Sequence, residues 1–207
     1  MQDYFSYFRA QSRSQPSCEI VHLGRLYLPS GKIICSDPFR TSEVSFLRQT
    51  VRAGNYDVNL CLVTLADWGR RVALASLTFE DREPAQWLIA DYVVGGEVFT
   101  TFQVESGLAC FMDLQTAELF EMVVAEYYRV NAEGNYYDDV LAAEFSRHVP
   151  AGWSRKSGDW DLHHPLRNDS RNIAIFASGL GDGAYSAFWG ITRDGQPAML
   201  VVDFQLL

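Results

Sequence analysis

The chain has 207 residues, of which 48% are apolar and 21% are charged, close to the average for globular proteins. This composition excludes an intrinsically disordered, collagen-like or low-complexity chain, and no apolar run is long enough for a transmembrane helix. The 26 acidic and 17 basic residues give a formal charge of −9, which disfavours binding to nucleic acid or a membrane and favours a basic protein partner.

The first 17 residues differ in pattern from the rest. Tyr4, Tyr7 and Phe8 follow helical spacing, which predicts a short helix docked on the body and followed by a polar linker. We therefore divide the chain into an N-terminal aromatic helix and linker, residues 1–17, and a single α+β domain, residues 18–207. The first residues lack the basic and apolar stretches of a signal peptide, so we expect a cytoplasmic protein.

From residue 20 the apolar residues alternate with a period of two, which is typical of strands. The pattern predicts three hairpins, namely 20–28 with 32–36, 56–66 with 71–79, and 86–94 with 97–104. Turn residues separate the two halves of each hairpin, and Gly95-Gly96 separates the last pair. Three successive hairpins predict an antiparallel meander.

After Asp113 the apolar period changes to 3.6, which predicts a helix with Asp113 as N-cap and Gly134 at its end. A second helix is predicted over 135–148, and a polar irregular segment over 149–171. Strands return at 172–178, 184–191 and 198–206. The order predicts an α+β fold: an antiparallel sheet, as a meander or sandwich, with two helices inserted before the last three strands.

The four cysteines, Cys18, Cys35, Cys61 and Cys110, form no CxxC pair and have no zinc-ribbon spacing. The last three lie in apolar runs, where a thiol behaves as a small hydrophobic group. We expect free thiols in a reducing compartment and no cofactor.

The sequence from Ser178 to Tyr185 contains three glycines within five residues. A phosphate-binding loop would be followed by a helix, whereas a strand is predicted here. The segment is therefore interpreted as a tight turn between two central strands, with positive φ at Gly181 or Gly183, or as a ligand or partner site. In the second case the candidate binding residues are Asp182, Tyr185 and Trp189.

These motifs resemble a bacterial family catalogued as domain of unknown function four-two-four-one. The matching motifs, in chain order, are Leu28-Pro29-Ser30-Gly31-Lys32, Ser36-Asp37-Pro38, Ala53-Gly54-Asn55-Tyr56, Phe111-Met112-Asp113, Ser178-Gly179-x-Gly181-Asp182-Gly183-x-Tyr185, Trp189-Gly190, Asp194-Gly195 and Val202-Asp203-Phe204. The pattern departs at Leu180, where an aromatic residue is expected. The resemblance implies a small bacterial cytosolic protein with an immunity or antitoxin role, and it transfers no catalytic residue.

Two further groups of polar residues are candidate sites. Asp37, Asp182 and Asp203 lie beside predicted turns or strand ends. Either their carboxylates form hydrogen bonds within the turns, or they converge to bind a divalent cation or to act as an acid–base pair. The predicted loop over 149–171 contributes Trp153, Trp160, His163 and His164, listed here as further candidate binding residues. Tryptophans that anchor a solvated loop are the simpler interpretation of this second group.

The sequence favours a non-enzymatic binding protein, most concretely an immunity protein that blocks a basic toxin or effector domain. The acidic charge, the 14% aromatic content and the absence of a complete catalytic motif support this hypothesis. The alternative is a metal-assisted hydrolase or ligand-binding enzyme that uses Asp37, Asp182 and Asp203. An oligomeric scaffold built on the N-terminal aromatic residues is a third hypothesis.

Overall fold

The computed structural model describes residues 3–9, 18–43, 45–148 and 160–207. Its α-helices are α1 (Tyr4–Phe8), α2 (Leu114–Val130) and α3 (Ala142–Phe145), with short helical turns at Thr41–Glu43, Tyr137–Leu141 and Ser146–His148. Its strands are β1 (Glu19–Leu28), β2 (Ile33–Ser36), β3 (Gly54–Leu65), β4 (Gly69–Thr78), β5 (Gln86–Ile89), β6 (Tyr92–Val94), β7 (Glu97–Phe99), β8 (Phe102–Val104), β9 (Leu108–Asp113), β10 (Trp160–His163), β11 (Ile173–Ala177), β12 (Gly183–Ile191) and β13 (Pro197–Asp203). Every strand pair is antiparallel, so the predicted α+β class is confirmed. None of the described helices has the length and apolarity needed to span a membrane.

Two sheets pack face to face. The larger one has seven strands in the order β1-β3-β4-β13-β12-β5, with β8 also paired to β12, and the smaller has the order β10-β11-β9-β2. The main core fills the space between them and includes Leu60, Phe111 and Phe176. Such interdigitated side chains from two sheets are the core of a β-sandwich.

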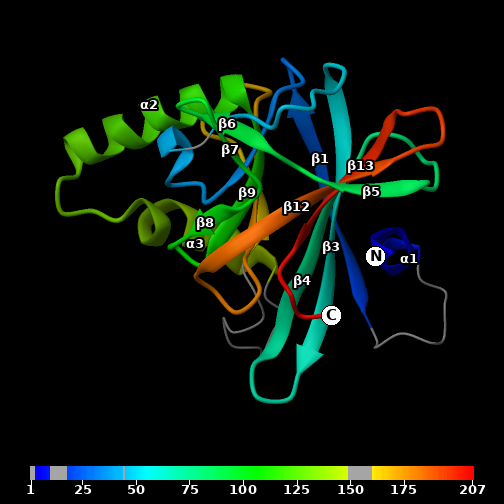
Figure 1. Ribbon diagram of the computed structural model, residues 1–207. Coiled ribbons are helices and arrows are strands. Elements are labelled where there is room, and N and C mark those ends of the chain that lie inside the picture. Colours follow the sequence, from blue (N-terminus) through cyan, green and yellow to red (C-terminus); the bar gives the residue numbers. More distant parts are fainter. Residues whose placement is uncertain (1–2, 10–17, 44, 149–159) are drawn as a thin grey trace.

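Helices cover the two outer faces (Figure 1). On the far face of the small sheet, α2 and α3 bury Phe120 and Phe145. On the far face of the large sheet, α1 buries Tyr4, whose ring lies 5.0 Å from the ring of Trp87 and whose hydroxyl donates to Asp203 over 3.0 Å. The predicted docking of an N-terminal helix is therefore confirmed, while the predicted linker, 11–17, lies outside the described residues.

The predicted hairpins differ in their outcome. The pairing of β3 with β4 is confirmed, whereas β1 pairs with β3 and β2 pairs with β9, so the first predicted hairpin is wrong. The turn at Gly31 carries the chain from one sheet to the other. Around Gly95-Gly96 only the short β6–β7 hairpin forms, and β5 and β8 both pair with β12.

The helical region follows the prediction more closely. The carboxylate of Asp113 accepts the backbone N–H of Gln115 over 2.9 Å and caps α2, as expected. The segment predicted as a second helix folds as the turns around α3. The strand β9 and the strand β10, the latter inside a segment predicted to be irregular, were not predicted.

Candidate binding surface

The glycine-rich loop joins β11 of the small sheet to β12 of the large sheet. It is therefore not a hairpin between two central strands of one sheet. Gly181 has a φ of +120°, as predicted, while Gly183 is not in the positive-φ region. The Tyr185 hydroxyl donates to the Gly181 carbonyl over 2.8 Å, so this side chain closes its own loop.

Most of the aromatic candidates from the sequence are in the core. Tyr185, Trp189 and Trp160 are buried, and Trp153 lies outside the described residues. His163 is also buried, and its Nδ1 lies 2.9 Å from a Glu144 carboxylate oxygen. Among the described members of this set, only Asp182 and His164 are exposed to solvent.

The side chain of His163 is enclosed on both of its nitrogens. Its Nε2 lies 3.0 Å from the hydroxyl of Tyr136, opposite the contact with Glu144. Burial, with the Glu144 charge as a second cause, raises the pKa of Tyr136 to about 12. This cluster ties β10 to the helical layer, and His164 lies on the other side of the chain, exposed to solvent.

The three aspartates of the alternative site lie in different places. Asp37 is buried and accepts three backbone N–H groups, whereas Asp203 accepts the Tyr4 hydroxyl. Asp182 is four residues before Ser186, which pairs with Asp203, so the two are roughly 13 Å apart along the sheet. Among the described residues, no three His, Cys, Asp or Glu side chains are close enough together to hold a metal ion.

We expect Asp182→Asn to change the free energy of unfolding by less than about 0.5 kcal/mol, because Asp182 is exposed and makes no hydrogen bond or ion pair within the described part of the chain. Urea denaturation of the two proteins checks this. A loss above 1 kcal/mol would show instead that the carboxylate stabilises the loop. A variant that folds normally and yet loses partner binding would add the loop to the binding surface.

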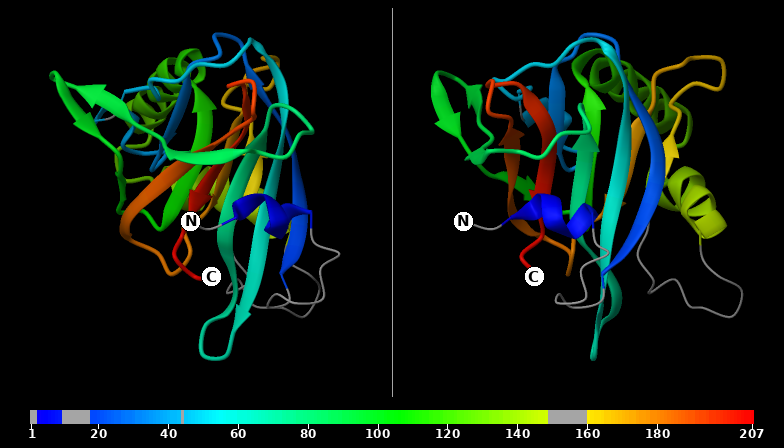
Figure 2. Two further views of the ribbon diagram at one scale, coloured as in Figure 1. Left: turned by 45° about the vertical axis from the view of Figure 1, so that its right-hand side comes forward. Right: turned by 90° about the vertical axis from the view of Figure 1, so that its right-hand side faces the viewer.

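The structure reveals a surface that the sequence interpretation missed. Six large apolar side chains are exposed on β5, β6 and β7: Leu88, Ile89, Val93, Val94, Val98 and Phe99. We call this group the β5–β7 surface. In both views of Figure 2 the β6–β7 hairpin projects from the body of the molecule. Exposed apolar residues are common singly, but such a group is typical of a binding site.

The hairpin is apolar on both of its faces. Val93 pairs with Val98 across the two strands, and the ring of Phe99 stacks on Tyr92 at 5.7 Å. Only Tyr92 is buried, and its hydroxyl donates to the Thr101 carbonyl over 2.9 Å, which fastens the base of the hairpin. A two-stranded hairpin is marginally stable alone, so a partner that covers it would stabilise it.

The chain segment that carries this surface is acidic. From Glu83 to Glu105 the chain has four carboxylates and no lysine or arginine. Two of the four are paired with arginines from elsewhere in the chain: Asp91 lies 3.0 Å from Arg48, and Glu105 contacts Arg40. Glu83 and Glu97 form no ion pair with any described residue, so the surface presents negative charge beside its apolar side chains.

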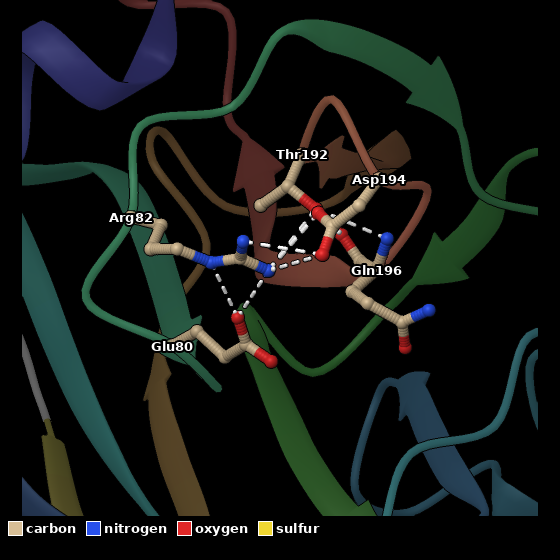
Figure 3. Close-up of polar contacts among 5 residues, drawn as sticks. All are labelled: Glu80, Arg82, Thr192, Asp194 and Gln196. Atoms are coloured by element: carbon tan, nitrogen blue, oxygen red, sulfur yellow. Dashed lines mark hydrogen bonds and ion pairs between the residues drawn. The ribbon is translucent and has the colours of Figure 1, made fainter.

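A polar network holds the loop that leads into β5 (Figure 3). The guanidinium of Arg82 donates to Glu80 over 2.7 Å and to Asp194 over 3.2 Å, and so joins this loop to the turn between β12 and β13. The Thr192 hydroxyl donates to Asp194 over 2.6 Å. Hydrogen bonds from Thr192 and then Arg82 lower the pKa of Asp194. A hollow of about 610 Å³ lies between the loop and the turn.

The backbone of β12 at Gly190 lies close to two side chains in and before β5. A Cβ atom at Gly190 would lie 2.7 Å from the Pro84 ring and 3.0 Å from the Trp87 ring. Glycine therefore fits at this position, which belongs to the Trp189-Gly190 motif. Together with the Arg82 network, this contact holds the edge of the sheet in one place.

Comparison with known proteins gives one family. The sequence model of a family described as "Protein of unknown function (DUF4241)" matches residues 26–202, a range that includes the whole β5–β7 surface. This match confirms the resemblance inferred from the motifs. No curated protein and no solved structure gives a significant match.

Proposed function

The chain belongs to the DUF4241 family, and from its own surface we propose that it is a non-enzymatic protein-binding module that holds a basic partner. The most concrete form of this proposal is a bacterial cytoplasmic immunity or antitoxin protein that neutralises a basic toxin domain. One observation carries it: the segment β5–β7 exposes six large apolar side chains, and the charged residues of this segment are all acidic.

Apolar burial would supply the binding energy. Full burial of a large apolar side chain contributes about 1.5–3 kcal/mol, so each half-exposed residue of the surface would add roughly 1 kcal/mol. Association and side-chain ordering offset part of that gain. The surface supplies apolar contacts on the projecting hairpin and on the sheet edge, which suits insertion of the hairpin into a cleft of the partner.

The negative charges would select the partner. Carboxylates around an apolar contact raise the association rate with a basic protein and disfavour acidic ones. The overall charge of −9 acts in the same direction over a longer range. A toxin that acts on nucleic acid needs a basic cleft, and an acidic protein that covers this cleft blocks access of the substrate.

We expect Val98→Asp to weaken binding of the partner at least thirtyfold and to abolish protection, because the charge enters the centre of an apolar contact. The test is co-expression with the product of the neighbouring gene, followed by co-purification, titration calorimetry and growth. Val98 is 56% exposed, so the substitution leaves the fold intact.

Trp68→Asp is the matched control, since Trp68 is 55% exposed on the turn between β3 and β4, at the opposite end of the molecule. It should bind as the wild type does. Equal affinity of Val98→Asp and the wild type would contradict the proposal, as would a partner that binds more tightly at high salt.

A further inference from the structure

The strand β5 is an edge of the seven-stranded sheet. It pairs with β12 on one side, and no described strand pairs with it on the other. Edge strands are commonly protected by charges or bulges. The opposite edge, β1, has an irregularity between His22 and Gly24, and its Arg25 pairs with Asp57. In contrast, β5 has the sequence Gln-Trp-Leu-Ile, without a charge.

The register shows which backbone groups face outward. Ala90 donates its N–H to the Ala187 carbonyl over 2.8 Å, within the same antiparallel register as the pair Leu88 and Trp189. From Gln86 to Ala90, the residues with even numbers therefore bond to β12, and Ala85 just before the strand also donates to Ile191. The N–H and C=O groups of Trp87 and Ile89 point to the open side of the strand.

The chain itself already uses this open side just beyond β5. Asp91 follows the same parity as Ile89, and its carbonyl accepts the N–H of Arg48 over 2.8 Å. Leu47 also forms a β-bridge with Tyr92. Strand pairing on this side therefore stops at Asp91. No described residue pairs there with the backbone groups of Trp87 and Ile89, which are available to another chain.

Exposed side chains on both faces of β5 would contact the side chains of an added strand. Leu88 and Ile89 are each 48% exposed and point to opposite faces, as consecutive strand residues do. A hollow of about 200 Å³ beside them is lined in part by Trp189, Ile191 and the ion pair of Asp91 with Arg48. Its size suits one large side chain of a strand that runs along the edge.

We propose that an extended basic segment of the partner adds to the sheet as a strand along β5, an inference that rests on the proposed function and specifies its mode of binding. Main-chain hydrogen bonds to Trp87 and Ile89 would give affinity, and the side chains beside them would give specificity. The overall charge of −9 and the absence of lysine and arginine from the chain between Glu83 and Glu105 favour a basic segment.

The test measures amide hydrogen exchange of the full chain in the presence of a capped peptide of four Arg-Val repeats. A capped peptide of four Glu-Val repeats is the control. The Arg-Val peptide should slow amide hydrogen exchange at Trp87 and Ile89 at least tenfold, and the Glu-Val peptide should not. Absence of binding, or binding without protection of these two amides, would overturn the proposal. A dimer that protects the same amides without any peptide would assign the edge to a second copy, and would also overturn it.

Two variants separate backbone pairing from side-chain contact. Ile89→Pro removes an N–H that faces away from β12, so the existing ladder keeps its hydrogen bonds. It should weaken peptide binding at least tenfold, whereas Ile89→Ala, which keeps the N–H, should weaken it less than threefold. Equal losses would overturn strand addition and leave the proposed function standing. An unchanged affinity of Val98→Asp for the natural partner would contradict the proposed function itself. If Ile89→Pro does not fold, the amide exchange of the wild type still decides.

Discussion

Gly31→Ala is expected to lower the free energy of unfolding by about 3–5 kcal/mol, a large part of the stability of a domain. Gly31 has a φ of +69°, which costs a residue with a side chain roughly 1–2 kcal/mol. The added Cβ would also lie 2.0 Å from the carbonyl oxygen of Val51, so backbone must move. Urea denaturation followed by circular dichroism measures the loss.

A second glycine isolates the steric part of this effect. Gly107 has a φ of +70°, and a Cβ atom there meets nothing within 4 Å. Gly107→Ala should therefore cost only the backbone strain, about 1–2 kcal/mol. If the two variants lose the same stability, the contact with Val51 is not what requires glycine at position 31.

Asp37→Ala is expected to cost about 3 kcal/mol of unfolding free energy. The buried carboxylate accepts the N–H groups of Phe39, Glu105 and Ser106 over 2.8–3.0 Å, and alanine leaves all three without this acceptor. Asp37→Asn retains one acceptor oxygen, so its free energy of unfolding should lie between those of Asp37→Ala and the wild type. The urea midpoints of the two variants measure both losses, provided that the dependence of the unfolding free energy on urea concentration is unchanged.

The matched control for Asp37 is Asp182→Ala, at an exposed aspartate of the same candidate site. It should change stability by less than about 0.5 kcal/mol. Comparable losses at both positions would contradict the assignment of Asp37 to a structural role. The pair thus separates an aspartate that the fold requires from one that is available to a partner.

Local signals predicted the elements whose contacts are local. The β3–β4 hairpin follows from alternating apolar residues around a turn in which Gly69 has a φ of +69°. The start of α2 follows from one side chain, Asp113, which caps it. In both cases the deciding interactions join residues close together in the chain.

Pairing between distant segments was not predictable in this way. All six residues of β9 are buried, so the strand shows none of the alternation that identifies a half-buried strand. Its neighbours, β2 and β11, are far away in sequence. The hairpin expected between β1 and β2 was wrong because an apolar strand such as β2 fits either sheet, and the choice depends on β9.

The candidate binding surface illustrates the same difficulty. Apolar residues in β5–β7 were predicted as strand residues, but their exposure depends on the position of β5 at the end of the sheet. Aromatic residues such as Trp189, which the sequence predicts as binding residues, are in the core. One sequence signal was available: the absence of basic residues from Glu83 to Glu105.

The strand order also has a consequence for synthesis of the chain on the ribosome. β13, the last strand in chain order, lies between β4 and β12. β4 ends at Thr78, and the strand that pairs with its outer edge is synthesised about 120 residues later. Synthesis of these residues takes roughly 6–24 s at bacterial or eukaryotic translation rates. During that interval β4, which has six consecutive residues that are buried in the folded protein, has an unpaired edge that can associate with other chains. We therefore expect that faster translation of the second half of the chain raises the yield of folded protein.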